Sequence, residues 1–271
     1  MTNKQRTDLI EKYIREHTYA DLRTLATEFG GSLSTVRRAL DLLEQRGLVR
    51  RHHGGASLVS NDALTQEYDF LARTQRQVDA KYAIAHFVAE QVRPGMTVII
   101  DGGTTPYAIA RLIAGRRVQV VTNSLPVATL FGDVGNAETT VTGGSVYGRF
   151  SQLLGPSCEQ AFEQIHADLA ILGGAGITEN GIWNANALIV SAQRKMIAAA
   201  ERTIFAVDNT KFGRKALSLT TPFEARFTIV TDTLPEPAVV NAIKAAGATL
   251  KLAEKARALR ETSEEEGSYE L

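Results

Sequence analysis

The chain has 271 residues, 44% of them hydrophobic, which predicts about two domains and enough apolar side chains for a sizeable core. Thirty Lys and Arg residues balance thirty Asp and Glu residues, so a uniformly basic nucleic-acid binder is excluded and any basic surface must be local. The single cysteine, Cys158, excludes an intramolecular disulfide framework, and no apolar run is long enough for a membrane span. We therefore expect a soluble cytoplasmic protein in which Cys158 is a small core residue.

Three short apolar stripes at helical spacing predict three helices at the start of the chain. The stripes are Leu9, Ile10, Tyr13 and Ile14, then Leu22, Leu25, Ala26 and Phe29, then Leu33, Val36, Leu40 and Leu43. Gly30-Gly31 predicts a tight turn before the third helix, and Ser32 predicts its N-cap because a serine hydroxyl accepts a bond from an orphaned backbone amide. Gly47 predicts its end, since glycine adopts the left-handed conformation found there.

The third predicted helix turns Ser34 and Arg38 away from its stripe, and a basic arm ending in Gly54-Gly55 follows. Residues 1–60 contain ten Lys or Arg and seven Asp or Glu, so they carry +3 and the rest of the neutral chain carries −3. Three helices, a glycine turn and a basic arm in this order predict a winged helix-turn-helix domain over residues 1–58 that binds double-stranded DNA. The side chains expected at the DNA are Ser34, Thr35, Arg37 and Arg38 on the helix, and Arg50, Arg51 and His53 on the arm.

Two other interpretations of this N-terminal segment remain open. Amphipathic helices with outward arginines are common, so the third helix by itself also fits an ordinary solvated surface. A protein-docking module is the second alternative, and the paired charges of Arg37-Arg38 and Arg50-Arg51 favour DNA over it.

Residues 59–76 are polar with scattered apolar positions and predict a connector. From residue 77 onward, β-rich runs alternate with helical runs, which indicates a mostly parallel sheet with helices on both faces over residues 77–260. After a helical stripe from Tyr82 to Ala89, strands are predicted at 97–100, 118–121, 138–142, 169–172, 203–207 and 228–231, and helices at 106–114, 125–131, 155–165, 187–200 and 236–246. Residues 261–271 contain five glutamates and no basic residue, and predict an acidic disordered tail.

Loops rich in glycine and hydroxyl side chains follow five of the predicted strands. Ligands of such sheets bind at the carboxyl ends of the strands, and glycine-rich loops that open helices bind anions. Each loop alone fits a structural turn, but their repetition favours a phosphate-bearing small ligand, without a dinucleotide or Walker motif. The candidate ligand-binding residues are Asp101, Gly103, Thr104, Thr105, Thr122, Asn123, Ser124, Gly143, Gly144, Gly173, Gly174, Asp208 and Lys211.

These motifs resemble those of the DeoR-type (DeoR/GlpR) bacterial transcriptional regulators, and the resemblance continues to about residue 215. The matching N-terminal residues are Thr35-Val36-Arg37-Arg38, Leu40, Leu43, Gly47, Leu48, Arg51 and His53-Gly54-Gly55-Ala56. The resemblance implies a winged helix-turn-helix followed by a Rossmann-like domain similar to pentose-phosphate isomerase and coenzyme A transferase folds. It also implies a sugar-phosphate effector pocket lined by the DGGTT, TN, GG and D-x-(S/T)-K-F-G segments, the last of which reads Asp208–Gly213 here.

The chain departs from the family pattern at three places. Ala39 stands where the family has an aspartate, and Gly31 stands where it has an aliphatic residue. In the helix after the glycine-rich loop, the family shows an acidic residue and a Lys-Arg pair, whereas residues 191–194 read Ser-Ala-Gln-Arg. This last departure bears on effector selectivity through Ser191 and Gln193.

The sequence thus predicts a sequence-specific DNA-binding regulator, a repressor of a carbohydrate-utilisation operon that a phosphorylated sugar controls. Its expected partners are operator DNA and the sugar phosphate, with no cofactor and no metal. A single DNA-binding domain offers little contact area, so we expect a homo-oligomer, a dimer or a tetramer, on repeated half-sites.

The alternative is a sugar-phosphate isomerase-like enzyme with an appended DNA-binding domain. Isomerisation needs a carboxylate that moves a proton and a cation that stabilises the enediolate. In the isomerases a lysine precedes the glycine run, but Leu172 precedes Gly173 here. The chain shows no nucleophile–His–acid arrangement, and its five histidines lack the spacing of metal ligands. We therefore expect a sensor without catalysis.

Overall fold

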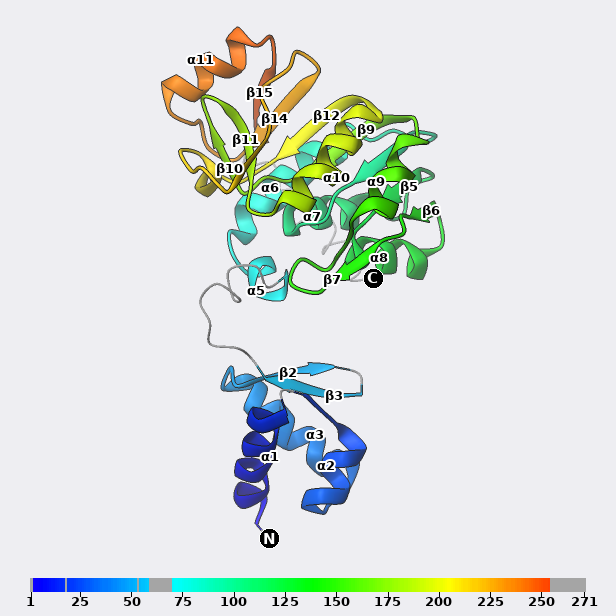
Figure 1. Ribbon diagram of the computed structural model, residues 1–271, viewed down its shortest axis with the longest axis vertical. Coiled ribbons are helices and arrows are strands. Elements are labelled where there is room, and N and C mark those ends of the chain that lie inside the picture. The colour runs from blue at the N-terminus through cyan, green and yellow to red at the C-terminus, as the bar shows by residue number, and fades with distance from the viewer. Residues whose placement is uncertain (1, 18, 53, 59–69, 254–271) are drawn as a thin grey trace, which may run out of the picture. The chain divides into compact units, whose positions relative to one another are not determined.

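The computed structural model describes residues 2–17, 19–52, 54–58 and 70–253, and the chain forms two compact units, Met1–Gln66 and Glu67–Leu271 (Figure 1). Most of the predicted connector and all of the predicted acidic tail lie outside the described residues. Residues 70–76, which the sequence assigns to the connector, belong to the second unit. Within the described parts of the chain, no helix is long and apolar enough to cross a membrane.

The first unit consists of three helices and a small antiparallel sheet. Its elements are α1 (Asn3–His17), β1 (Tyr19–Asp21), α2 (Leu22–Phe29), α3 (Leu33–Gln45), β2 (Val49–His52) and β3 (Gly55–Leu58). The strands lie in the order β1-β3-β2, so the basic arm forms a hairpin whose second strand also pairs with β1. The sequence predicted the three helices and the arm, but not the short strand β1.

The apolar stripes form the core of this unit. Ile10, Leu25 and Leu40 are fully buried, whereas Leu9 and Leu33, at the margins of their stripes, are about two-fifths exposed. The Ser32 hydroxyl accepts the backbone N–H of Thr35 at 3.2 Å, which confirms the predicted N-cap of α3. Gly47 adopts a φ of +70°, the left-handed conformation expected after the helix.

The second unit is built around a seven-stranded parallel sheet in the order β15-β14-β12-β9-β4-β5-β6. The strands are β4 (Thr97–Ile100), β5 (Gln119–Thr122), β6 (Glu138–Val141), β9 (Ala167–Leu172), β12 (Ala200–Ala206), β14 (Phe227–Thr231) and β15 (Thr249–Leu252). The helices are α5 (Phe70–Thr74), α6 (Val78–Ala89), α7 (Thr104–Ile113), α8 (Leu125–Val134), α9 (Pro156–Glu163), α10 (Ala187–Ala198) and α11 (Pro237–Ala245).

Helices cover both faces of this sheet, as predicted. Successive residues of a strand point to opposite faces: Ile99 of β4 packs in a cluster with residues of α9, α10 and α11, whereas Val98 and Ile100 pack with residues of α6, α7 and α8. Fully buried phenylalanines, Phe162 on one face and Phe131 on the other, fill these two layers. The architecture is therefore the Rossmann-like α/β fold that the sequence predicted.

Two small antiparallel sheets and the edge strand β15 were not predicted. They are the hairpin of β7 (Ser145–Tyr147) and β8 (Gln152–Leu154), and the sheet β10-β11-β13 formed by Gly176–Thr178, Gly181–Asn184 and Ser218–Thr221. These short strands lack the continuous apolar run that makes β4 (TVII) recognisable in the sequence. Several element boundaries also differ from the prediction. For example, the helix predicted to reach residue 200 ends at Ala198, because β12 already begins at Ala200 and pairs there with Ala167.

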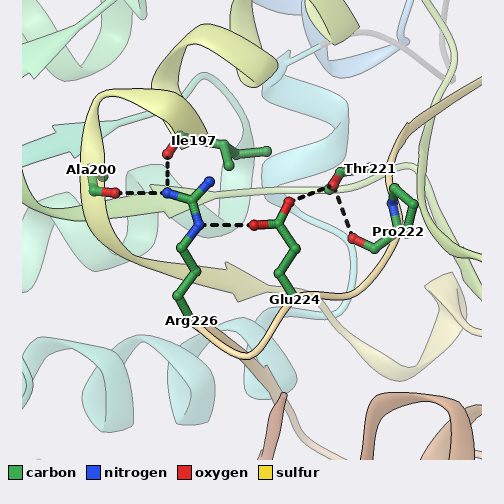
Figure 2. A network of polar contacts seen from close by, with 6 residues as sticks. All are labelled: Ile197, Ala200, Thr221, Pro222, Glu224 and Arg226. Atoms are coloured by element: carbon green, nitrogen blue, oxygen red, sulfur yellow. Dashed lines mark hydrogen bonds and ion pairs between the residues drawn. The ribbon is translucent and has the colours of Figure 1, made fainter. Parts of the chain in front are cut away.

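Arg226 fixes the carboxyl end of α10 against the sheet (Figure 2). Its Nη1 donates to the backbone carbonyls of Ile197 at 2.9 Å and Ala200 at 3.1 Å, and its Nε donates to Glu224 Oε2 at 2.9 Å. The last carbonyls of a helix have no N–H donor within the helix, so a cation that donates to them stabilises the helix end. The hydroxyl of Thr221 donates in turn to Glu224 Oε1 at 3.4 Å, which links the end of β13 to the same network. This holds in place the helix that carries Gln193.

Candidate functional site

A cavity of about 710 Å³ lies in the second unit at the carboxyl ends of β4, β9 and β12. This is where parallel α/β sheets bind ligands, and its size suits a small metabolite. The cavity brings together eight of the predicted ligand-binding residues: Asp101, Gly103, Thr104, Thr105, Gly173, Gly174, Asp208 and Lys211. The remaining five, Thr122, Asn123, Ser124, Gly143 and Gly144, do not line it.

Four of those five residues make structural contacts near the sheet edge instead. Thr122 Oγ1 donates to the carbonyl of Ile100 at 2.6 Å, and the Ser124 hydroxyl caps α8. Asn123 Nδ2 donates to the carbonyl of Leu153 at 3.1 Å. Gly144 has a φ of +130°, and a Cβ there would lie 2.7 Å from the Leu154 carbonyl oxygen, so this glycine allows β8 to approach.

Asp101 lies on the floor of the cavity, 2% exposed, and is held by neutral donors. Gln193 Nε2 donates to its Oδ2 at 2.6 Å, Gln152 Nε2 donates to its Oδ1 at 3.0 Å, and the Gly173 N–H donates to Oδ2 at 3.4 Å. Burial raises the pKa of Asp101 from 3.8 to about 6, and the Gln193 hydrogen bond opposes part of that rise. Gln152 can come this close because a Cβ on Gly102 would lie 2.0 Å from its Nε2.

Gln193 is the centre of a saturated hydrogen-bond network. Besides Asp101, its Nε2 donates to the Gly173 carbonyl at 3.0 Å, and its Oε1 accepts from Asn184 Nδ2 at 3.1 Å and Thr220 Oγ1 at 3.3 Å. Gln193 stands at the departure from the family's Lys-Arg pair. A neutral amide therefore holds the buried carboxylate at the position where the family pattern has a cation.

Apart from Lys211, the basic side chains that form a cationic wall of the cavity were missed by the sequence analysis. Six basic side chains line the cavity against two acidic ones, Asp101 and Asp208; the six are Arg73, Arg76, Lys81, Lys211, Arg214 and Lys215. Lys81 is 7% exposed, and burial lowers its pKa to about 8, against the opposing effect of Asp208. One sequence signal could have found it: Lys81 shares a helical face with Ile84 and Val88, and a lysine on an apolar stripe is unusual.

The DGGTT loop opens α7 into the cavity. Gly103 has a φ of +140°, a conformation that other residues rarely adopt, and it immediately precedes the first helical residue, Thr104. Thr104 and Thr105 are 4% and 7% exposed. A helix N-terminus with hydroxyl side chains favours an anion or a polar oxygen. In the residues that the structure describes, no group of three or more His, Cys, Asp or Glu side chains is arranged to hold a metal ion.

The first unit presents the predicted DNA-contacting residues of α3 on its surface. Ser34, Arg37 and Arg38 are exposed and Thr35 is half-buried. On the arm, Arg50 and Arg51 are half-buried, and His53 lies outside the described residues. The guanidinium of Arg51 forms an ion pair with Asp41 of α3, and its backbone N–H donates to Glu44 Oε1 at 2.7 Å. These two contacts fasten the arm to α3.

Two solved structures resemble this chain weakly. Ribose 5-phosphate isomerase A from Methanocaldococcus jannaschii is 14% identical, with a TM-score of 0.37, over 50% of this chain and 54% of that one. The eIF2B delta subunit from Chaetomium thermophilum is 14% identical, with a TM-score of 0.39, over 71% of this chain and 63% of that one. At these TM-scores the likeness supports no argument about function.

Comparison with characterised proteins is more informative. The glycerol-3-phosphate regulon repressor of Escherichia coli K12 is 33% identical over 80% of this chain and 86% of its own length. The transcriptional repressor AccR of Agrobacterium fabrum is 34% identical over 82% and 87%, and the L-fucose operon activator of Haemophilus influenzae is 31% identical over 78% and 85%. A model of the DeoR-like helix-turn-helix domain matches residues 6–62, and a model of the DeoR C-terminal sensor domain matches residues 76–233. The chain therefore belongs to the DeoR family of DNA-binding transcriptional regulators.

Proposed function

We propose that this regulator is a repressor of a carbohydrate-utilisation operon and that a phosphorylated sugar or sugar derivative in the cavity of the sensor domain controls its DNA binding. The observation that carries the proposal is the composition of that cavity. Six basic side chains line it together with Thr104 and Thr105 at a helix N-terminus, and Asp101 and Asn184 offer partners for hydroxyl groups. The names of similar proteins, a glycerol-3-phosphate regulon repressor and an L-fucose operon activator, support a carbohydrate ligand.

We further propose that the cavity senses its ligand without converting it. Leu172, which precedes the glycine run, is fully buried and cannot stabilise an enediolate. Asp101 is bound by the amides of Gln152 and Gln193, which hold its carboxylate in place. An isomerase-like activity remains the competing hypothesis, and turnover of a bound sugar phosphate distinguishes the two.

The pocket hypothesis is tested by a thermal-shift panel of phosphorylated sugars and sugar alcohols against the free compounds. A ligand present at about 100 times its Kd stabilises the folded protein by roughly 2.7 kcal/mol. We expect one phosphorylated compound to give this shift in the wild type and not in Thr104→Ala, because the buried Thr104 hydroxyl lines the cavity. Thr104→Ala should retain wild-type operator affinity and lose the response of that affinity to the ligand.

Thr129→Ala is the matched control, since Thr129 is exposed on α8 and does not line this cavity. It should keep both the shift and the response. Formation of product in the same wells would replace the sensor by an enzyme, and a panel in which no phosphorylated compound stabilises the protein would refute a sugar-phosphate ligand.

For the DNA-binding domain we propose two different roles for its arginines. Arg37 and Arg38, with Ser34 and Thr35, face the DNA from α3, and Arg50 and His53 contact the backbone or minor groove from the arm. Arg51 was predicted to contact DNA as well, but its ion pair with Asp41 supports a role in holding the arm against α3.

These roles predict different salt dependences. Arg37→Ala should weaken operator binding by about 1–3 kcal/mol if it reads a base, or lower the salt slope of binding by about 1 if it contacts a phosphate. Arg51→Ala should weaken binding while leaving the slope unchanged, because it displaces the arm instead of removing a phosphate contact. Fluorescence anisotropy with operator DNA at several salt concentrations measures both quantities.

A double-mutant cycle provides the control for Arg51. If the ion pair positions the arm, Asp41→Asn and Arg51→Ala should be non-additive, with a coupling of about 0.5–3 kcal/mol. Additive effects together with a lower salt slope in Arg51→Ala would identify Arg51 as a phosphate contact, as the sequence analysis predicted.

We also propose that the protein acts in the cytoplasm as a homo-oligomer, a dimer or a tetramer. The support is geometric: one helix-turn-helix domain contacts only one half-site, and operators of such proteins repeat the half-site to match the symmetry of the protein.

A further inference from the structure

We propose that the anionic group of the effector binds at the turn between α5 and α6, where Lys81 receives it with Arg73 and Arg76 beside it. This inference rests on the proposed function and adds which residues of the cavity bind the charged group of the effector. None of these three residues is among the strand-end loops that the family resemblance implies. All three line the cavity.

The ammonium group of Lys81 is held in a defined position. It donates hydrogen bonds to the backbone carbonyls of Arg73, in the last turn of α5, and of Arg76, in the turn after the helix, the latter at 2.5 Å. An ammonium group has three donors, and these two bonds leave one N–H for a ligand. Lys81 is 7% exposed and lines the cavity, so a ligand acceptor is the natural partner for that donor.

The electrostatics of this wall favour an anion. A buried charge is costly unless an opposite charge compensates it, and within the described residues Lys81 forms no ion pair. Burial lowers the pKa of Lys81 to about 8, Asp208 opposes this, and the positive charges of Arg73, Lys211 and Arg76 lower it further. Lys81 thus remains mostly protonated near pH 7, with Asp208 as its counter-charge and three further cations close by. A bound phosphate would relieve the repulsion among these cations.

The part of the cavity around Asp101 suits the uncharged end of the ligand. Asp101 would repel a phosphate, and the amides around it are neutral. Hydroxyl groups can donate to a carboxylate and accept from amides. The ligand would therefore lie with its phosphate toward the α5–α6 turn and its hydroxyl groups toward Asp101.

The turn is also connected to other parts of the sensor domain. Phe70 of α5 packs edge-to-face on Tyr107 of α7, with ring centroids 5.4 Å apart. Gln77 has a φ of +52°, a left-handed conformation at a non-glycine residue, and lines the cavity. Strained backbone of this kind persists only where its surroundings hold it. Since α5 is the first described element of the sensor unit, an anion at this turn binds close in sequence to the connector.

Titration with inorganic phosphate tests the proposal, with the full-length protein and with chloride at matched ionic strength as reference. Two variants each remove one cation at the α5–α6 turn: Lys81→Met, and Arg76→Gln, which changes an exposed side chain and so leaves the fold intact. We expect the Kd for phosphate to rise about tenfold or more in Lys81→Met and several-fold in Arg76→Gln. Arg117→Gln, the same change at an exposed arginine outside the cavity, should bind as the wild type does.

Hydrogen exchange gives a second readout, which shows where on the chain the anion binds. Phosphate should slow exchange of the backbone amides between residues 73 and 81 in the wild type and in Arg117→Gln, and to a smaller extent in Arg76→Gln. If neither Lys81→Met nor Arg76→Gln weakens phosphate binding and the turn gains no protection, the anion binds elsewhere and this inference is wrong, while the sensor function stands. If no phosphorylated compound binds the wild type, the proposed function itself fails.

Discussion

Replacing Gly55 with alanine is expected to abolish high-affinity operator binding while leaving the sensor domain intact. Gly55 begins β3 and pairs with Asp21 of β1. A Cβ at this position would lie 2.2 Å from the carbonyl oxygen of Ala20 and 2.8 Å from the Cα of Asp21. Both are backbone atoms, so no side chain can rotate away and the hairpin itself must move from β1.

We expect this displacement to destabilise the DNA-binding domain by about 3 kcal/mol, the upper part of the usual cost of overpacking. Thermal unfolding of the full chain followed by circular dichroism should show the lower stability of the DNA-binding domain. The only tryptophan, Trp183, lies in β11 of the sensor unit, so its fluorescence melting curve should stay unchanged. Operator affinity follows from anisotropy titrations.

Gly54→Ala is the matched control for this prediction. A Cβ on Gly54 would meet only the Tyr19 hydroxyl, at 3.9 Å, which is ordinary van der Waals contact. Its effect on stability should stay within about 0.5 kcal/mol. Equal operator affinity and melting behaviour for Gly55→Ala and the wild type would show that β3 does not need to lie against β1.

Replacing Asp101 with asparagine is expected to remove a large pH dependence from the stability of the sensor domain. The folded-state pKa of Asp101 is raised by burial from 3.8 to about 6, so the folded protein holds this proton more tightly than the unfolded chain does. The stabilisation is complete below pH 4 and is lost as pH rises through 6. Because a tenfold change in proton affinity corresponds to about 1.4 kcal/mol, the loss amounts to about 3 kcal/mol by pH 7.

Asparagine does not titrate, so the free energy of unfolding of Asp101→Asn relative to the wild type should increase by about 3 kcal/mol from pH 4 to pH 7. The amide of Gln152 makes no other hydrogen bond among the described residues and can rotate to accept from the N–H group of the introduced asparagine. Denaturant unfolding followed by Trp183 fluorescence at several pH values measures this difference, from which the contributions of other carboxylates cancel.

Asp133→Asn is the control, because Asp133 is exposed on α8 and outside the cavity. Its stability relative to the wild type should be the same at pH 4 and pH 7. If the stability difference between Asp101→Asn and the wild type also stayed constant from pH 4 to pH 7, the cavity would be hydrated enough to keep the Asp101 pKa near its unfolded value.

Local sequence determined the three helices of the first domain and, except for β15 and α5, the strands and covering helices of the large sheet. Apolar stripes fixed the buried faces of α1, α2 and α3, and single residues fixed the ends of α3: Ser32 accepts the N-terminal amide, and Gly47 takes the left-handed conformation. In the sensor domain, alternating β-rich and helical runs were enough to predict a parallel sheet with helices on both faces. The strand-end position of the cavity follows from that fold alone, which is why eight of thirteen candidate residues line it.

Only the tertiary structure decided which residues share a site. Asp101 meets Gln152 and Gln193, 51 and 92 positions later, and no local pattern indicates such contacts. The same holds for the arm, where Arg51 pairs with Asp41 instead of pointing freely outward. The cationic wall was hidden for a related reason: Lys81 sits in an apolar helix, and its role depends on the α5–α6 turn that packs over it. Periodicity and capping act over a few residues and can be read from the sequence, whereas burial and charge at a site depend on segments that only folding brings together.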